Sequence, residues 1–190
     1  MRRDKPPQLH NALLVIDVQD SFKAGARWAQ RNNPSFEANV TRLIEAFRKR
    51  GQLVVYFMDN DDDEHFNPAS PYYRLMDFLE PRADERIFHK YSRNCFTTTP
   101  LQQLLQQNGV AKVTIAGIKT EQCCETTARV ASDLGFDVDF VTEATLTFPI
   151  SGSLCGGREM PAAEVIERTE YVLRGRFARI RTVAEVVASL

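Results

Sequence analysis

The sequence predicts an α/β fold in which helices cover both faces of a mostly parallel, six-stranded sheet. Two observations carry this prediction. Several short apolar runs lack alternating polar residues, which is typical of strands buried on both faces. Between them lie segments whose apolar residues recur every three or four positions, as in amphipathic helices. This alternation favours parallel strands joined by right-handed crossovers.

The first half of the chain is expected to form three strands and two helices. The strands are the apolar runs at residues 12–16 and 53–58 and a short third segment at residues 86–89. The first helix, residues 34–50, is expected to end at Gly51. Its buried face is formed by Phe36, Val40, Leu43, Ile44 and Phe47. The second helix is expected to start at Pro100, with Thr99 as its cap, and to close at Asn108.

The second half continues the alternation. Strands are predicted at residues 112–116, 137–141 and 177–180. Helices are predicted at residues 121–134 and 162–173, and a terminal helix follows the capping-box sequence from Thr182 to Glu185. No repeat, low-complexity tract or linker interrupts the order, so we expect one domain over residues 1–190.

Composition narrows the class of protein. Hydrophobic residues make up 43% and charged residues 26% of 190 residues, enough for a sizeable core. The net charge of −1 gives no electrostatic footprint for nucleic acid or an anionic membrane. The apolar run before Asp17 is too short for a signal peptide or a membrane span. Four cysteines, of which Cys123 and Cys124 are adjacent, do not resemble a disulfide framework. We therefore expect a cytoplasmic protein with reduced thiols.

Polar residues follow several of the predicted strands. In an open parallel sheet, ligands bind beyond the carboxyl ends of the strands, where the strand order reverses. Asp59 follows the second strand, and Thr142 and Glu143 follow the fifth. Asp17 follows the first strand, Lys90 the third, and the segment containing Cys123 the fourth, so a carboxylate, an ammonium and a thiol could meet at one edge. Taken singly, each has a simpler explanation: a turn-capping aspartate, a solvated lysine and a small buried thiol. Together they supply a proton carrier, an electrostatic activator and a nucleophile.

The position of Cys123 strengthens this hypothesis. Thr120 is a suitable cap for the following helix, which places Cys123 in the first turn. Unpaired N–H groups and the helix dipole there favour a thiolate, so a lowered thiol pKa is expected. Cys124 points about a third of a turn away, toward the helix interior, and is expected to be structural.

Three separated motifs give the sequence a specific family resemblance. They are LLVIDVQDSF at residues 13–22, HKYSRNCF at 89–96 and GIKTEQCCETTAR at 117–129. In order and spacing, residues 12–143 resemble the isochorismatase-like cysteine hydrolases, which include nicotinamidases, N-carbamoylsarcosine amidases and isochorismatases. The resemblance implies a three-layer Rossmann-like fold and a homodimer or homotetramer.

The resemblance also implies roles for individual residues. Asp17, Lys90 and Cys123 match the catalytic triad of the family. A cis peptide is implied between Ile118 and Lys119, with an oxyanion hole formed by the backbone N–H groups of Lys119 and Cys123. Family members that hydrolyse the vinyl ether of isochorismate lack this cysteine. Its presence therefore favours cleavage of an amide or ureide C–N bond in a small molecule.

No metal or other cofactor is expected. Metal-binding members carry an Asp-x-His pattern after the second strand, but the residue two positions after Asp59 is not histidine. The only histidines of the chain are His10, His65 and His89. The acidic stretch at 59–65 also lacks the glycine of a calcium loop, so a solvated acidic loop is expected. This departure weakens the nicotinamidase interpretation. Residues 59–81 as a whole are expected to form a loop with one helical turn.

Other features have less certain roles. The aromatic residues available for a substrate pocket are Phe22, Trp28, Phe66 and Tyr73. The loop at residues 148–161 is a candidate lid or subunit contact, and Cys155 within it receives no role.

Three alternatives to amide hydrolysis stay open. They are vinyl ether hydrolysis with Cys123 as a bystander, a non-catalytic oligomeric member of the fold, and a redox sensor. The redox sensor would pair Cys123 with Cys124, and it ranks last because adjacent cysteines form disulfides poorly.

Overall fold

A computed structural model describes residues 11–152 and 156–190. Its main sheet has six parallel strands in the order β3-β2-β1-β4-β5-β8. They are β1 (Asn11–Ile16), β2 (Leu53–Asp59), β3 (Arg86–Lys90), β4 (Lys112–Ile118), β5 (Asp137–Leu146) and β8 (Arg179–Ile180). The predicted α/β class and parallel sheet are confirmed.

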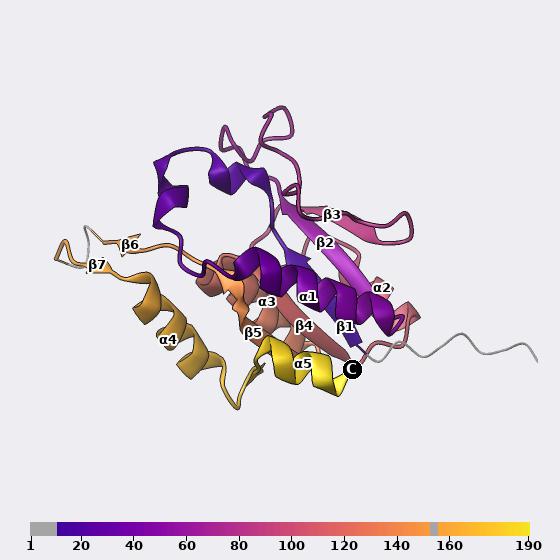
Figure 1. Ribbon diagram of the computed structural model, residues 1–190. Coiled ribbons are helices and arrows are strands. Elements are labelled where there is room, and N and C mark those ends of the chain that lie inside the picture. Colours follow the sequence, from indigo (N-terminus) through magenta and orange to yellow (C-terminus); the bar gives the residue numbers. More distant parts are fainter. Residues whose placement is uncertain (1–10, 153–155) are drawn as a thin grey trace, which may run out of the picture.

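Helices cover both faces of the sheet and complete three layers (Figure 1). One layer contains α1 (Phe36–Lys49) and α5 (Val183–Ser189). The other contains α2 (Leu101–Gln107), α3 (Glu125–Asp133) and α4 (Ala162–Leu173). In β1, Leu13 and Val15 pack toward the first layer, while Leu14 and Ile16 pack toward the second. Burial on both faces explains why this run is continuously apolar.

Some predicted boundaries are wrong. β5 continues to Leu146, five residues beyond its predicted end at Val141. Its register against β4 shifts, since Ile115 pairs with Phe140 whereas Gly117 pairs with Thr145. The shift accommodates the polar residues that made the strand seem to end.

Two local predictions also need correction. Pro100 is the residue before α2 and not its first residue, although the Thr99 hydroxyl does accept the Leu101 N–H at 3.2 Å. Residues 59–81 contain turns but no helical segment. The capping box of α5 is confirmed, with Thr182 and Glu185 bonded reciprocally.

Several short elements lie outside the predicted set. Two 3₁₀ helices, η1 (Asp20–Lys23) and η2 (Ala26–Gln30), follow β1. β6 (Ile150–Ser151) and β7 (Glu159–Met160) form a separate antiparallel pair within the 148–161 loop. Cys155 and His10 lie outside the described residues. None of the described helices combines the length and apolar composition that a membrane crossing requires.

The order of the strands reverses at the centre of the sheet, where β1 lies between β2 and β4. At the carboxyl ends of β1 and β4 the backbones of these two strands come unusually close. Gly117 in β4 has φ +138°, and a Cβ on it would lie 2.0 Å from the carbonyl oxygen of Ile16. Asp17 directly follows Ile16. Because Gly117 has no Cβ, β4 can approach Ile16 closely, and Asp17 therefore lies near the loop that follows β4.

Replacement of Gly117 by alanine is expected to destabilise the fold by at least about 3 kcal/mol, because main-chain atoms must move apart. Gly135→Ala is the matched control: Gly135 also has a positive φ, +88°, but nothing lies within 4 Å of its Cβ position. It should cost only about 1 kcal/mol, the strain of a left-handed alanine. Urea unfolding measures both. If both variants lost the same free energy of unfolding, the close approach of Gly117 to Ile16 would not be the reason for a glycine at this position.

Candidate active site

Asp17 occupies the first position after β1, at the reversal point of the sheet. Its backbone has φ 53°, and its N–H donates to the carbonyl of Phe57 at 3.0 Å. Aspartate tolerates this left-handed conformation better than most residues. In this conformation the carboxylate points inward, and Asp17 is 0% exposed.

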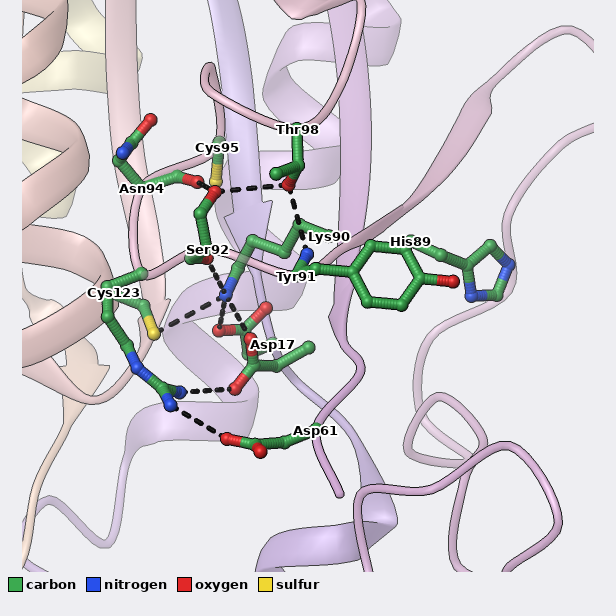
Figure 2. A network of polar contacts seen from close by, with 12 residues as sticks. Asp17, Asp61, His89, Lys90, Tyr91, Ser92, Asn94, Cys95, Thr98 and Cys123 are labelled. Carbon is green, nitrogen blue, oxygen red and sulfur yellow. Dashed lines mark hydrogen bonds and ion pairs between the residues drawn. The ribbon is translucent and has the colours of Figure 1, made fainter. Parts of the chain in front are cut away.

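Lys90 is the last residue of β3, and its ammonium lies at the centre of the polar group in Figure 2. Nζ lies 2.9 Å from Asp17 Oδ2 and 2.7 Å from Asp59 Oδ1. It also donates to the Ser92 carbonyl at 3.1 Å and to Cys123 Sγ at 3.5 Å. Lys90 is 0% exposed, and a buried ammonium of this kind needs the partners that it has.

Cys123 belongs to a turn of π-helix, η3 (Thr120–Cys124), that precedes α3. The Cys124 N–H donates to the Lys119 carbonyl at 3.2 Å and closes this wide turn. Lys119 therefore stands at the cap position that was predicted for Thr120. The Thr120 hydroxyl instead donates to the Thr145 hydroxyl at 2.8 Å, because it faces β5 and not the helix. The peptide bond between Ile118 and Lys119 is cis.

The structure thus brings together Asp17, Lys90 and Cys123, which are far apart in the sequence. Burial raises the pKa of Asp17 to about 7, although Lys90 opposes the shift. Burial alone would lower the pKa of Lys90, but the Asp17 carboxylate and its other neighbours outweigh that effect and raise it. At neutral pH, Lys90 is therefore charged and Asp17 is poised between its two forms.

The expected lowering of the Cys123 pKa is wrong. Burial, followed by the negative charge of Asp17, raises the pKa of the Cys123 thiol well above its ordinary value. Only 4% of the residue is exposed, so loss of hydration outweighs the helix dipole. The resting nucleophile is a thiol. A base must remove its proton, and the carboxylate of Asp17 is suitably placed to do so.

Asp59 was expected at the end of the second strand, but sequence reasoning gave it no role in this group. We expected a solvated acidic loop, but Asp59 is only 5% exposed and ion-paired to Lys90. Gln19 holds its backbone from both sides: Oε1 accepts the Asp59 N–H at 2.8 Å and Nε2 donates to its carbonyl at 3.2 Å. Arg93 completes the arrangement, with NH1 2.9 Å from Asp59 and NH2 2.7 Å from Asp61. The signal in the sequence was the position of Asp59 directly after an apolar run, which is typical of a buried strand end.

Asp59 positions Lys90, so Asp59→Asn is expected to lower kcat about 10²-fold through misplacement of the ammonium. The charge of Asp59 also raises the pKa of Asp17, so its removal should shift the acidic limb of the pH–rate profile to lower pH. Asp61→Asn is the matched control, because Asp61 contacts Arg93 and is exposed. An Asp59→Asn profile that does not move would contradict the positioning role.

Three groups that could serve as metal ligands lie at the same place. Ligand atoms of Asp17, Asp59 and Cys123 all lie within 4.8 Å of one another. However, Lys90 Nζ is in contact with all three, so an ammonium holds the position that a cation would need. His65 pairs with Glu64 at 3.1 Å. His89 bonds to the Tyr73 hydroxyl at 2.7 Å. Among the described residues, those at this position therefore do not fit a resident metal.

Three of the four candidate pocket residues come together. Phe22 contacts Phe66, with ring centroids 4.9 Å apart, and both Phe22 and Trp28 lie 6.3 Å from Phe148. Phe148 was not anticipated, because its place depends on the end of β5. Tyr73 does not join this aromatic cluster and stacks on His89 at 5.7 Å. Burial raises the pKa of Tyr73 to about 12, so its hydroxyl stays protonated.

The fold and site define an α/β protein with a carboxylate, a lysine and a cysteine where the strand order reverses. Comparison with known proteins shows which family it belongs to. The isochorismatase domain model matches residues 11–168, so the chain belongs to the isochorismatase family. Members of this family are hydrolases.

Individual relatives span most of the chain. The isochorismatase family protein YrdC of Bacillus subtilis is 29% identical over 178 residues, covering 93% of this chain and 94% of the relative. Nicotinamidase 3 of Arabidopsis thaliana is 44% identical over 167 residues, covering 77% and 78%. The crystal structure of a putative hydrolase of the family from Chromobacterium violaceum superimposes with a TM-score of 0.88 at 28% identity, covering 100% and 96%. The resemblance stated from the motifs is confirmed.

Proposed function

We propose that the protein is a cysteine hydrolase that cleaves an amide or ureide C–N bond of a small molecule through a thioester on Cys123. One observation carries the proposal: a single buried ammonium, Lys90 Nζ, contacts both a carboxylate with a raised pKa and a cysteine sulfur. The carboxylate can accept the thiol proton, and the ammonium stabilises the thiolate that results.

The first half of the reaction forms the thioester. Asp17 takes the proton from Cys123, and the sulfur attacks the carbonyl carbon. The backbone N–H groups of Lys119 and Cys123 are proposed to hold the developing oxyanion, an effect worth about 3–4 kcal/mol per donor. Asp17 then gives its proton to the leaving nitrogen as the C–N bond breaks, and ammonia or an amine departs.

The second half regenerates the enzyme. Asp17, again ionised, removes a proton from water, and the hydroxide attacks the thioester carbon. The C–S bond breaks, the carboxylic acid leaves, and the Cys123 sulfur recovers the proton from Asp17. The same carboxylate acts as base and acid in each half, which suits a pKa of about 7.

Ammonia release from a panel of primary amides, ureides and carbamoyl amino acids tests the proposal. Nicotinamide belongs in the panel because nicotinamidase 3 is among the relatives. Acid quenching during turnover should trap an acyl group on the peptide containing Cys123, visible by mass spectrometry and released by hydroxylamine. Because Lys90 holds the cation position, a chelator should leave the rate unchanged.

Two other results would redirect the assignment. Hydrolysis of isochorismate with no adduct on Cys123 would indicate vinyl ether cleavage. No turnover, with a thiol as unreactive toward iodoacetamide as a buried cysteine, would indicate a non-catalytic member of the family. Solution mass under the same conditions would test the expected homodimer or homotetramer.

A further inference from the structure

The side chain of Lys119 is a charged group that the proposed mechanism leaves unused. Its backbone follows the cis peptide and caps the turn that carries Cys123. Nζ lies 5.9 Å from the centroid of the Phe148 ring. Within residues 11–152 and 156–190, this ammonium makes no ion pair or hydrogen bond. A half-buried ammonium held only by an aromatic face has lost hydration without a matching anion.

The charged groups around Lys119 include two cations, Arg27 and Arg93, and the carboxylate of Glu121. Arg27 lies over the same Phe148 ring, with its guanidinium carbon 5.5 Å from the centroid. Burial and then Arg27 lower the pKa of Lys119, and the charge of Arg93 acts in the same direction. Glu121 is the opposing carboxylate, but it accepts a hydrogen bond from the Thr147 hydroxyl at 2.6 Å. The Lys119 ammonium therefore lies beside the nucleophile turn with Arg27 over the same ring and, among the described residues, without a salt bridge.

Arg93 is a weaker candidate for the same role. Its NH1 group is 2.9 Å from Asp59 and its NH2 group is 2.7 Å from Asp61, so both ends of its guanidinium already face carboxylates. Lys119 has no such partner. It also stands at the junction of the aromatic cluster (Phe22, Trp28, Phe66 and Phe148) with the turn that carries Cys123.

We propose that Lys119, supported by Arg27, binds an anionic group of the substrate, so that the substrate is an amide or ureide that also carries a carboxylate. The inference rests on the proposed function. A carboxylate would supply the partner that the ammonium lacks, and a charge-assisted hydrogen bond between them is stronger than a neutral one. The aromatic cluster would face the carbon chain between the two groups. Lys119 is then a specificity-determining residue.

A pair of alkylating reagents tests the charge without depending on hydrolysis. Iodoacetate and iodoacetamide are similar in shape and differ in one negative charge. Each forms an S–C bond at Cys123 with loss of iodide, which mass spectrometry of the peptide follows. The ratio of the iodoacetate rate to the iodoacetamide rate is expected to fall about tenfold in Lys119→Met. Lys119→Arg should keep the ratio above that of Lys119→Met. Lys49→Met, at an exposed position in α1, is the matched control and should not change the ratio.

Two isosteric substrates test the substrate class. Succinamate and butyramide differ in having a carboxylate or a methyl group at the far end. The unmodified protein is expected to prefer succinamate in kcat/KM about 10- to 100-fold, mainly through KM, and Lys119→Met should lose that preference.

The outcomes separate the two proposals. An alkylation ratio that is unchanged in Lys119→Met would overturn the role of Lys119 while leaving amide hydrolysis standing. Equal hydrolysis of both amides would overturn the anionic substrate class in the same way. A Cys123 thiol that neither reagent modifies would overturn both proposals, since no substrate group could then reach it.

Discussion

Cys123→Ala is expected to abolish amide hydrolysis, lowering kcat by at least about 10⁴-fold, as loss of the nucleophile does in other covalent hydrolases. Asp17 and Lys90 would remain in contact, so the loss would come from the missing sulfur and not from collapse of the group. Ammonia release measures the rate, and circular dichroism confirms the fold.

Cys124→Ala is the matched control for this prediction. Cys124 is the neighbouring residue, is 0% exposed and packs in the layer between the sheet and α2 and α3. Its replacement should cost about 1–2 kcal/mol of stability and leave the catalytic group in place. If Cys123→Ala hydrolysed the substrate as well as Cys124→Ala, sulfur would have no covalent role, and vinyl ether chemistry would become the better assignment.

The three residues of the proposed triad were predictable because the fold determines where they meet. Apolar runs identified β1 and most of β4, and the short segment before Lys90 was predicted as β3. The residues after parallel strands meet at one edge of the sheet. No local pattern was needed for Asp17, Lys90 and Cys123 beyond their place after these strands. The reversal of strand order beside β1 then brought them within contact distance.

The rest of the site depends on contacts that leave no local signal. Asp59 looks like the first member of a solvated acidic run, and it is buried only because Gln19 fixes its backbone from β1's end. Phe148 was not predicted as part of the aromatic cluster. Polar residues interrupt β5 at the register shift, and they made the strand seem to end earlier.

The protonation state of Cys123 shows a limit of a different kind. The sequence locates the residue correctly in a first helical turn, but the sign of its pKa shift depends on competing terms. Dipole and N–H groups lower a thiol pKa, while burial and a nearby carboxylate raise it. The second pair wins here because the residue is almost completely buried next to Asp17. Formation of the thiolate therefore depends on a base, the role already expected for Asp17.

Asp17→Asn is therefore expected to lower kcat by about 10³- to 10⁴-fold, because asparagine can neither accept the thiol proton nor return it. In the unmodified protein, the ionised form of Asp17 is the base, and its pKa is raised to about 7. Hydrolysis should then rise as pH increases toward 7 and level off above it. The residual activity of Asp17→Asn should lack this limb.

Alkylation by iodoacetamide should respond to the same substitution in the opposite direction. The charge of Asp17 contributes to the raised pKa of Cys123, so its removal lowers the pH at which the thiolate forms. Asp17→Asn would thus be a poorer hydrolase with a Cys123 thiol that alkylates at lower pH. The buried thiols of Cys95 and Cys124 should stay unmodified, as they would not in an unfolded chain. Alkylation of Cys95 and Cys124 together with Cys123 would instead assign Asp17 to maintenance of the fold. Separation of the two effects would establish it as the group that carries the proton.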